Sequence, residues 1–146
     1  MRAWITDCPL DVAGLLESIR ENGHGAAVLF VGTVRDLNEG RVVLGIRYEA
    51  YREMAEPLLV QIVTEAEEMT GPCAIAAVHR IGDLDVGEAS VAVAVSTPHR
   101  AQAFTAARYI IEEIKKRLPV WKHERYVEGE GEWLKGVSPQ AGARHE

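Results

Sequence analysis

The spacing of apolar residues changes back and forth along the chain, and the order of these changes limits the possible folds more than any other feature. Runs typical of strands alternate with three segments whose apolar residues recur at helical spacing. The predicted order is one strand, a helix, two strands, a helix, two strands, a helix and two strands. Because consecutive strands can pair as hairpins, this order predicts an α+β fold with three helices and a largely antiparallel sheet.

The predicted elements have the following limits. Strands are expected at 2–6, 26–34, 42–51, 73–81, 89–97, 120–127 and 132–135, and helices from 12 to near 22, over 53–70 and over 98–118. The strands 26–34 and 42–51, joined by the polar turn 35–41, are expected to form one hairpin. Thr97 is the expected N-cap of the third helix, with Pro98 at its first position.

Two of the helices have apolar stripes that predict their buried faces. The stripe of the second helix contains Met54, Leu58, Ile62 and Ala66. The stripe of the third contains Phe104, Ala107, Ile111, Ile114 and Leu118.

The size and composition favour one globular domain. The chain has 146 residues, 47% of them hydrophobic, which is enough for a core without disulfides or metals. We expect a single domain over 1–135 and a loosely structured tail over 136–146. Cys8 and Cys73 lie far apart without the spacing of a metal site or disulfide framework, so we expect reduced thiols in a cytoplasmic protein. We expect no signal peptide, and no apolar run approaches the length of a membrane span.

Charge and motifs exclude several kinds of function. The formal net charge of −6 argues against nonspecific nucleic-acid binding, which needs a cationic face. The glycines lack the spacing of phosphate-loop and dinucleotide motifs, and the histidines lack metal-ligand spacing. We therefore expect no cofactor and no metal, and any anion site must depend on a few local Arg and Lys residues.

The start of the third helix is one such place. Free backbone N–H groups and the positive end of the helix dipole favour an anion there, and His99 and Arg100 add two donors. A phosphate would suit this position. The alternative is that both are ordinary surface residues of the first turn.

The end of the same helix places Lys115 at the edge of the apolar stripe. A partly desolvated lysine near other cations suits proton transfer or nucleophilic chemistry. The alternative is a lysine whose stem covers apolar surface while its ammonium reaches water. Lys116 and Arg117 project away from the stripe and are expected to be solvated.

The strand after Pro119 carries alternating polar residues. Lys122 and Glu124 share one face, and Trp121, His123 and Arg125 share the other. Lys122 and Glu124 can act as donor and acceptor for one ligand, or form an exposed ion pair of little energetic consequence. Arg35 follows the strand 26–34 and can reach an anion or simply meet solvent.

Five segments together resemble the large, catalytic subunits of molybdopterin synthases. They are FVGTVRDLNEG at 30–40, YEAYREMAE at 48–56, VHRIGDLDVGE at 78–88, STPHRAQAF at 96–104 and IKKRLPVWKHE at 114–124. The last two are the most specific, because a His-Arg pair at a helix start followed by a Lys and a Pro-x-Trp-Lys strand is not a general structural pattern.

The resemblance implies a fold, a site and partners. The fold is an α/β hammerhead with a small added subdomain. The residues implied to line the substrate pocket are Thr33, Val34, Arg35, His99, Arg100, Lys115, Lys122, His123 and Glu124, with Lys115 and Lys122 catalytic. Members of the family form a homodimer within a heterotetramer and bind a small ubiquitin-like sulfur carrier at each end. The carrier's C-terminal Gly-Gly thiocarboxylate gives its sulfur to cyclic pyranopterin monophosphate, which forms the dithiolene of molybdopterin.

The chemistry implied by the resemblance agrees with the local cations, because the cyclic phosphate and the thiocarboxylate are two anions that must meet. Two other functions remain open on the residues alone. One is a noncatalytic module that binds the acidic or carboxylate tail of a partner. The other is an unrelated enzyme that acts on a small phosphorylated metabolite.

Overall fold

The computed structural model describes residues 2–127 and 132–135. The predicted tail 136–146 lies outside the described residues. The elements are β1 (Arg2–Thr6), α1 (Val12–Ser18), β2 (Ala26–Thr33), β3 (Leu37–Asn38), β4 (Arg41–Ala50), α2 (Arg52–Thr70), β5 (Ala74–Arg80), β6 (Gly82–Asp85), β7 (Ala89–Thr97), α3 (Arg100–Arg117), β8 (Val120–Tyr126) and β9 (Glu132–Lys135). Among the described residues, no helix is both long and apolar enough to cross a membrane.

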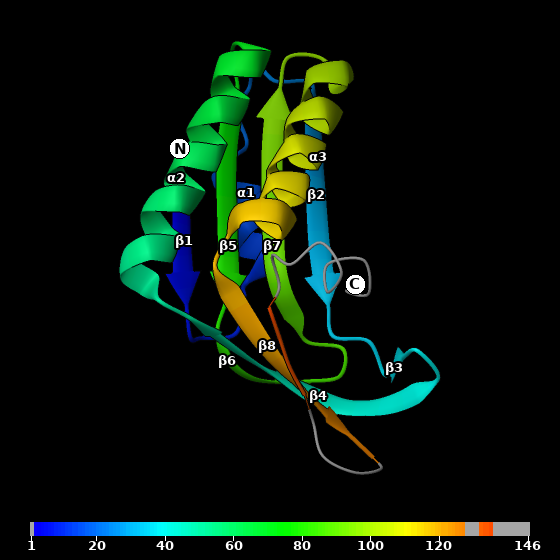
Figure 1. The fold of residues 1–146 in the computed structure, drawn as a ribbon. Helices are drawn as coiled ribbons and strands as arrows, with labels where there is room; N and C mark the ends of the chain where they lie inside the picture. Colours follow the sequence, from blue (N-terminus) through cyan, green and yellow to red (C-terminus); the bar gives the residue numbers. More distant parts are fainter. Residues whose placement is uncertain (1, 128–131, 136–146) are drawn as a thin grey trace.

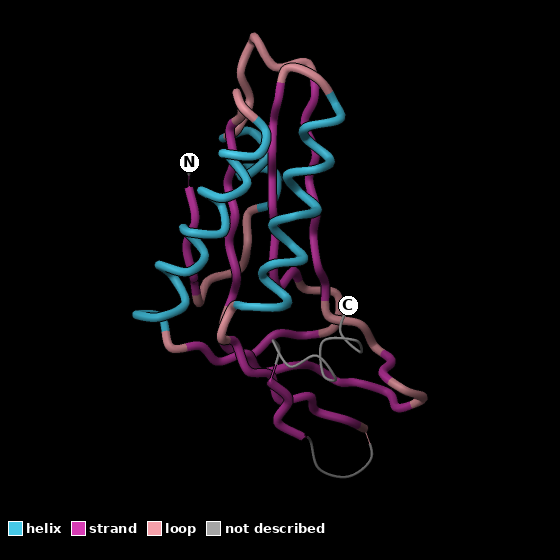
Figure 2. Tube along the Cα trace, turned by 45° about the horizontal axis from the view of Figure 1, so that its top comes forward, coloured by secondary structure: helices cyan, strands magenta, loops and turns pink. Residues whose placement is uncertain are grey.

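The strands form two sheets, an upright one packed against the helices and a second one below its end (Figure 1). The first sheet has the order β1-β5-β7-β2; β1 and β5 are parallel, and the other neighbours are antiparallel. The second contains β3, β4, β8 and β9 in that order, with β6 also paired to β4. Figure 2 shows its strands lying across the end of the first sheet. The predicted α+β class and the largely antiparallel pairing are confirmed.

The predicted hairpin between 26–34 and 42–51 is wrong. β2 pairs with β7 in the first sheet, whereas β4 pairs with β3, β6 and β8 in the second. The reason lies in the turn: Glu39 and Gly40 both have positive φ, 51° and 81°, as the favoured two-residue hairpin turns require. This tight turn pairs Asn38 with Arg41, so a short local hairpin replaces the long one.

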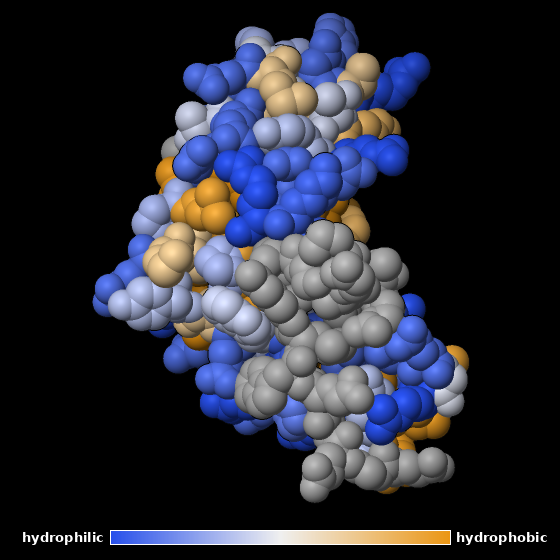
Figure 3. Space-filling view, viewed as in Figure 1, coloured by the Kyte–Doolittle hydropathy of each residue, from blue (hydrophilic) through white to orange (hydrophobic). Residues whose placement is uncertain are grey.

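The alternation of β7 explains how the first sheet is covered on both faces. Val91, Val93 and Val95 belong to the main core with α2 and α3, while Ala92 and Ala94 pack in a smaller cluster with α1. Side chains of a strand alternate between faces, so the sequence VAVAV at 91–95 places the larger valine side chains against the two long helices. The outer surface of these helices is predominantly hydrophilic (Figure 3).

The buried faces of α2 and α3 are rotated from the predicted stripes. Met54 and Phe104 were expected in the core but are 60% and 62% exposed. The buried residues are Ala55, Leu59, Ile62, Val63 and Ala66 in α2 and Ala103, Ala106, Ala107, Ile110 and Ile114 in α3. Small alanines let α3 approach the sheet and α2 closely, which a phenylalanine on that face would prevent.

Two helix ends also differ from prediction. The first helix ends at Ser18 rather than near residue 22, and beyond it the hydroxyl of Ser96 donates to the carbonyl of Ile19. The third helix has His99 rather than Thr97 as its N-cap. Thr97 is buried in β7, and its hydroxyl donates to the carbonyl of His99, so the chain stays extended for two more residues.

Gly45 lies where β4 pairs with a strand on each side, β6 on one and β8 on the other. Gly45 is opposite Asp85 of β6 and Arg125 of β8. A Cβ at this position would lie 2.7 Å from the carbonyl oxygen of Leu84, closer than van der Waals contact. The glycine therefore lets β6 and β4 approach, which fixes β4 beside β8, the strand with the predicted Lys and Glu.

Candidate active site

A small hollow lies between the end of β2 and the second sheet. It is lined by Thr33, Arg35, Leu37, Asn38, Ile46, Lys122 and Glu124. β2 supplies Thr33, the following loop supplies Arg35, and β8 supplies the Lys and Glu. Four of the nine predicted site residues therefore meet here. The volume is about 10 Å³, far below the ~300 Å³ of small ligand pockets. The hollow alone is too small to hold a ligand and can form only one side of a binding site.

Lys122 and Glu124 form the buried part of this hollow. Lys122 is 3% exposed and Glu124 is 2% exposed, and the Lys122 Nζ atom lies 4.0 Å from Glu124 Oε1. The prediction that they share a face is confirmed, while the alternative of an exposed ion pair is wrong. The burial alternates along β8, so that Lys122, Glu124 and Tyr126 lie on the covered face of the strand.

Two further residues, neither of them predicted from the sequence, extend this pair: Asn38 binds Glu124, and Tyr126 binds Asn38. Asn38 Nδ2 donates to Glu124 Oε1 at 3.1 Å and to the Tyr126 hydroxyl at 3.3 Å. The Arg41 guanidinium lies 3.6 Å from the centre of the Tyr126 ring. We call Asn38, Lys122, Glu124 and Tyr126 the strand cluster. Strand alternation alone places Tyr126 with Glu124, but nothing in the sequence pattern brings Asn38 across from β3.

Lys115 lies in the last turn of α3, close in the chain to β8. It is half-buried, and the next residue, Lys116, is exposed, so the prediction that Lys115 borders the core is confirmed. The end of the helix thus places one half-buried lysine just before the strand that carries Lys122.

Arg117 differs from the prediction of a solvated charge. It donates to Glu65 Oε1 at 2.7 Å and Oε2 at 3.1 Å, and to Glu113 Oε1 at 3.0 Å. The Tyr109 hydroxyl also donates to Glu65 Oε1, at 2.7 Å. We call Glu65, Tyr109, Glu113 and Arg117 the helix clamp. The hydrogen bonds from Arg117 and then Tyr109 lower the pKa of Glu65 from 4.5 to about 2. The contact arises because α2 packs beside α3, which one helix's periodicity does not reveal.

Val34 and His123 lie beside the hollow in sequence but are placed differently. Val34 is buried in the core, and its backbone is bonded to Gly87 and Glu88 in the turn before β7. His123 is half-buried on the opposite face of β8 and lies across from Arg47 of β4. The structure therefore does not bring these two side chains together with Lys122 and Glu124.

His99 and Arg100 lie at the far end of α3 from Lys115. The helix has 18 residues, which at 1.5 Å per residue is a length of about 27 Å. Both residues are exposed. Within one chain, His99 and Arg100 are therefore far from Lys115 and the hollow.

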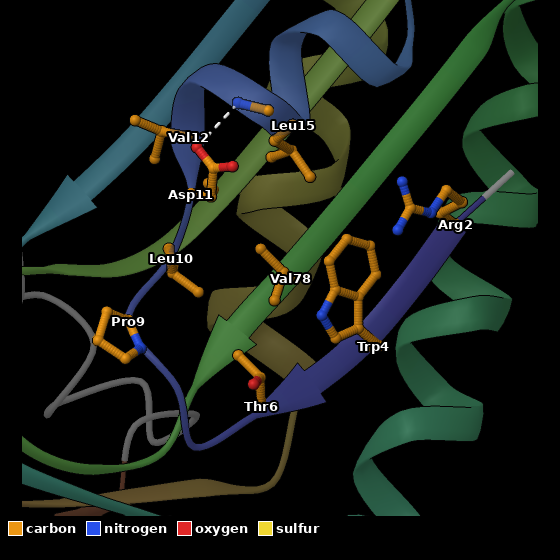
Figure 4. A pocket seen from close by; sticks show the side chains of 11 residues that line it. Arg2, Trp4, Thr6, Pro9, Leu10, Asp11, Val12, Leu15 and Val78 are labelled. Atoms are coloured by element: carbon orange, nitrogen blue, oxygen red, sulfur yellow. Dashed lines mark hydrogen bonds between the residues drawn. The ribbon is translucent and has the colours of Figure 1, made fainter.

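Another cavity, of about 340 Å³, lies between β1 and α1 (Figure 4). Its polar groups already have partners: the Arg2 guanidinium lies 4.9 Å from the Trp4 ring centre, and Asp11 caps α1 by accepting from the Gly14 N–H. None of its described lining residues is a predicted site residue. Within 2–127 and 132–135 there is also no group of His, Cys, Asp and Glu suited to a metal ion.

Known proteins resemble the chain in sequence and in structure. The family model described as "MoaE protein" matches residues 5–117. The molybdopterin synthase catalytic subunit of Bacillus subtilis is 42% identical over 130 residues, which cover 89% of this chain and 82% of that protein. The corresponding subunit of Halalkalibacterium halodurans is 40% identical over 142 residues, covering 95% and 91%.

A crystal structure of molybdopterin synthase from Staphylococcus aureus superposes with a TM-score of 0.86 at 36% identity, covering 92% of this chain and 97% of that one. These likenesses confirm the resemblance that the five segments suggested. The chain therefore belongs to the MoaE protein family.

Proposed function

We propose that this protein is the catalytic subunit of a molybdopterin synthase. It transfers sulfur from the C-terminal thiocarboxylate of a small ubiquitin-like carrier to cyclic pyranopterin monophosphate and so forms the dithiolene. The observation that carries the proposal is the hollow in which Arg35, Lys122 and Glu124 meet. With its free cysteines, we expect the protein to act in the reducing cytoplasm.

Electrostatics supports this role for the hollow. Both reactants are anions, and the chain itself carries a net charge of −6. Two anions can meet only where local cations offset their repulsion and the loss of water. Arg35 and Lys122 line the hollow, and Lys115 precedes β8 by only a few residues.

Each cation has a distinct proposed role. Arg35 suits bidentate contacts with phosphate or pterin oxygens, because its guanidinium is planar and always charged. Lys115 is the main catalytic residue, which stabilises the thiocarboxylate adduct and assists proton transfer. Lys122 neutralises the charge that develops in the transition state. Thr33 and Glu124 complete the lining of the hollow.

A second copy of the chain would complete the site. The helix-start residues His99 and Arg100 lie about a helix length from Lys115 in one chain, so they reach a shared pocket only from a neighbouring subunit. The small size of the hollow points the same way. The proposed assembly is a homodimer with one carrier at each end, in which the second copy and the carrier tail supply the missing walls.

The test is direct: the protein is mixed with thiocarboxylated carrier and pterin precursor, and the dithiolene product is detected by fluorescence after oxidation. Lys115→Ala should abolish the product while carrier docking stays nearly intact. Lys116→Ala is the matched control, since Lys116 is the exposed neighbour of Lys115, and it should turn over normally.

Other outcomes would overturn the proposal. Carrier binding by the wild type without product would indicate a binding module. Hydrolysis of phosphate esters without any carrier would indicate an unrelated enzyme. Normal turnover by Lys115→Ala would refute the catalytic role of that lysine.

A further inference from the structure

The segment 35–42, all of which the structure describes, buries a single residue, and that residue is polar. Asn38 is 6% exposed, while every other residue of the segment is exposed, including the apolar Leu37 and Val42 at 51% each. A hairpin kept for its contribution to the core would bury an apolar side chain. The buried contact of this hairpin is made instead with Glu124 and Tyr126 of β8.

The hydrogen bonds of the Asn38 amide show what the contact does. The Nδ2 group has two hydrogens, and both find oxygens: one meets Glu124 Oε1 and the other meets the Tyr126 hydroxyl. Glu124 Oε1 is also the atom 4.0 Å from Lys122 Nζ. Asn38 therefore fixes the carboxylate oxygen that faces the lysine.

The position of Asn38 is itself fixed from two sides. The tight turn at Glu39 and Gly40 sets the register of β3 on β4, and the Val43 N–H donates to the Asp36 carbonyl. Arg41, at the other end of the turn, stacks on the Tyr126 ring. The amide is thus held rigidly, as a group that orients a reacting charge must be.

We propose that Asn38, with Tyr126 behind it, is a positioning residue that orients Glu124 and through it the Lys122 ammonium for sulfur transfer. This inference rests on the proposed function and adds to it a device outside the set of residues predicted to contact substrate. Asn38 acts as a hydrogen-bond donor, so its shape alone does not suffice.

The deciding variant is Asn38→Asp, which keeps the size of the side chain but replaces the donor by a second carboxylate facing Glu124. We expect kcat to fall about 10- to 100-fold, the range for losing a hydrogen bond to a charged group. The KM for carrier should stay near the wild-type value, because the carrier surface is unchanged. Asn38→Ala should behave similarly, and Asn22→Ala, at an exposed asparagine, is the matched control that should have no effect.

Tyr126→Phe covers the case in which the Asn38 variants fail to fold. It removes the hydroxyl that accepts the second amide hydrogen, and we expect a two- to tenfold lower kcat, about that of one neutral hydrogen bond. Wild-type kcat in Tyr126→Phe, or in a folded Asn38→Asp, would overturn the inference and leave the proposed function standing. A wild type that makes no dithiolene would overturn both.

Discussion

The helix clamp and the strand cluster each bring an acid and a base together, but they are built in different ways. In the clamp, Arg117 and Glu65 are 29% and 28% exposed and joined by two hydrogen bonds, the shorter of 2.7 Å. In the cluster, the side chains of Lys122 and Glu124 are only 4% and 3% exposed, but the Lys122 Nζ atom lies 4.0 Å from Glu124 Oε1. The more deeply buried pair therefore has the longer contact.

This difference supports the proposal that the helix clamp contributes to stability and the strand cluster to chemistry. A close, bidentate Arg–carboxylate contact at a partly exposed helix interface fastens α2 to α3. Burying a Lys and a Glu costs desolvation that a longer contact offsets poorly, so such a pair is weak support for stability. Because Lys122 and Glu124 line the hollow, the proposed function explains why a costly buried pair is present.

The largest expected effect comes from Lys122→Met, which leaves Glu124 buried without the ammonium. Breaking a buried ion pair from one side destabilises a protein by about 3–5 kcal/mol. We expect a loss of this size in urea unfolding, together with loss of dithiolene product. Adding Glu124→Gln should restore most of the stability and none of the activity. If Lys122→Met alone were as stable as the wild type, the buried Glu124 carboxylate would have to be compensated by another group.

An intermediate effect is expected from Arg117→Met in the helix clamp. The unfolding free energy should fall by less than in Lys122→Met, with sulfur transfer unchanged. Because the folded pKa of Glu65 is depressed from 4.5 to about 2, chiefly by Arg117, the stabilisation is fully present above pH 4.5 and is lost as the pH falls towards 2. Urea unfolding at a series of pH values should show the gap between wild type and variant narrowing on acidification. If the difference in unfolding free energy between wild type and variant did not change with pH, Glu65 would not be the source of the stabilisation.

The smallest effect is expected from Arg108→Ala, also on α3. Arg108 and Glu112 form an exposed i,i+4 pair at 3.0 Å, with side chains 80% and 51% exposed. Such pairs contribute about 0.3–0.5 kcal/mol, so the change should be barely measurable by thermal unfolding and should disappear at high salt. If Arg108→Ala lost as much stability as Arg117→Met, the greater exposure of the Arg108–Glu112 pair would not explain its weaker contribution.

The predictions that succeeded depend on one element at a time. Strand alternation placed Lys122 and Glu124 on one face, and helical periodicity placed Lys115 at the edge of a buried stripe. Both patterns are properties of the local backbone. The family resemblance added the residue set, of which the structure groups Thr33, Arg35, Lys122 and Glu124.

The predictions that failed depend on how elements meet. Phe104 fits a helical stripe as well as Ala103 does, and only packing against α2 and the sheet decides between them. Arg117 looked solvated because Glu65 is supplied by another helix. The long hairpin failed because a turn with two positive φ angles at Glu39 and Gly40 is not apparent from a polar segment. The same turn brings Asn38 to Glu124, so the missed hairpin and the missed positioning residue have one cause.

The most direct test of the contrast between the two pairs is to remove both charges from each and measure dithiolene formation in folded protein. Lys122→Met/Glu124→Gln should unfold at close to the wild-type urea concentration and make no product. Arg117→Met/Glu65→Gln should make product at the wild-type rate. Wild-type turnover by the first double variant would contradict the account, because the buried pair would then be dispensable for sulfur transfer.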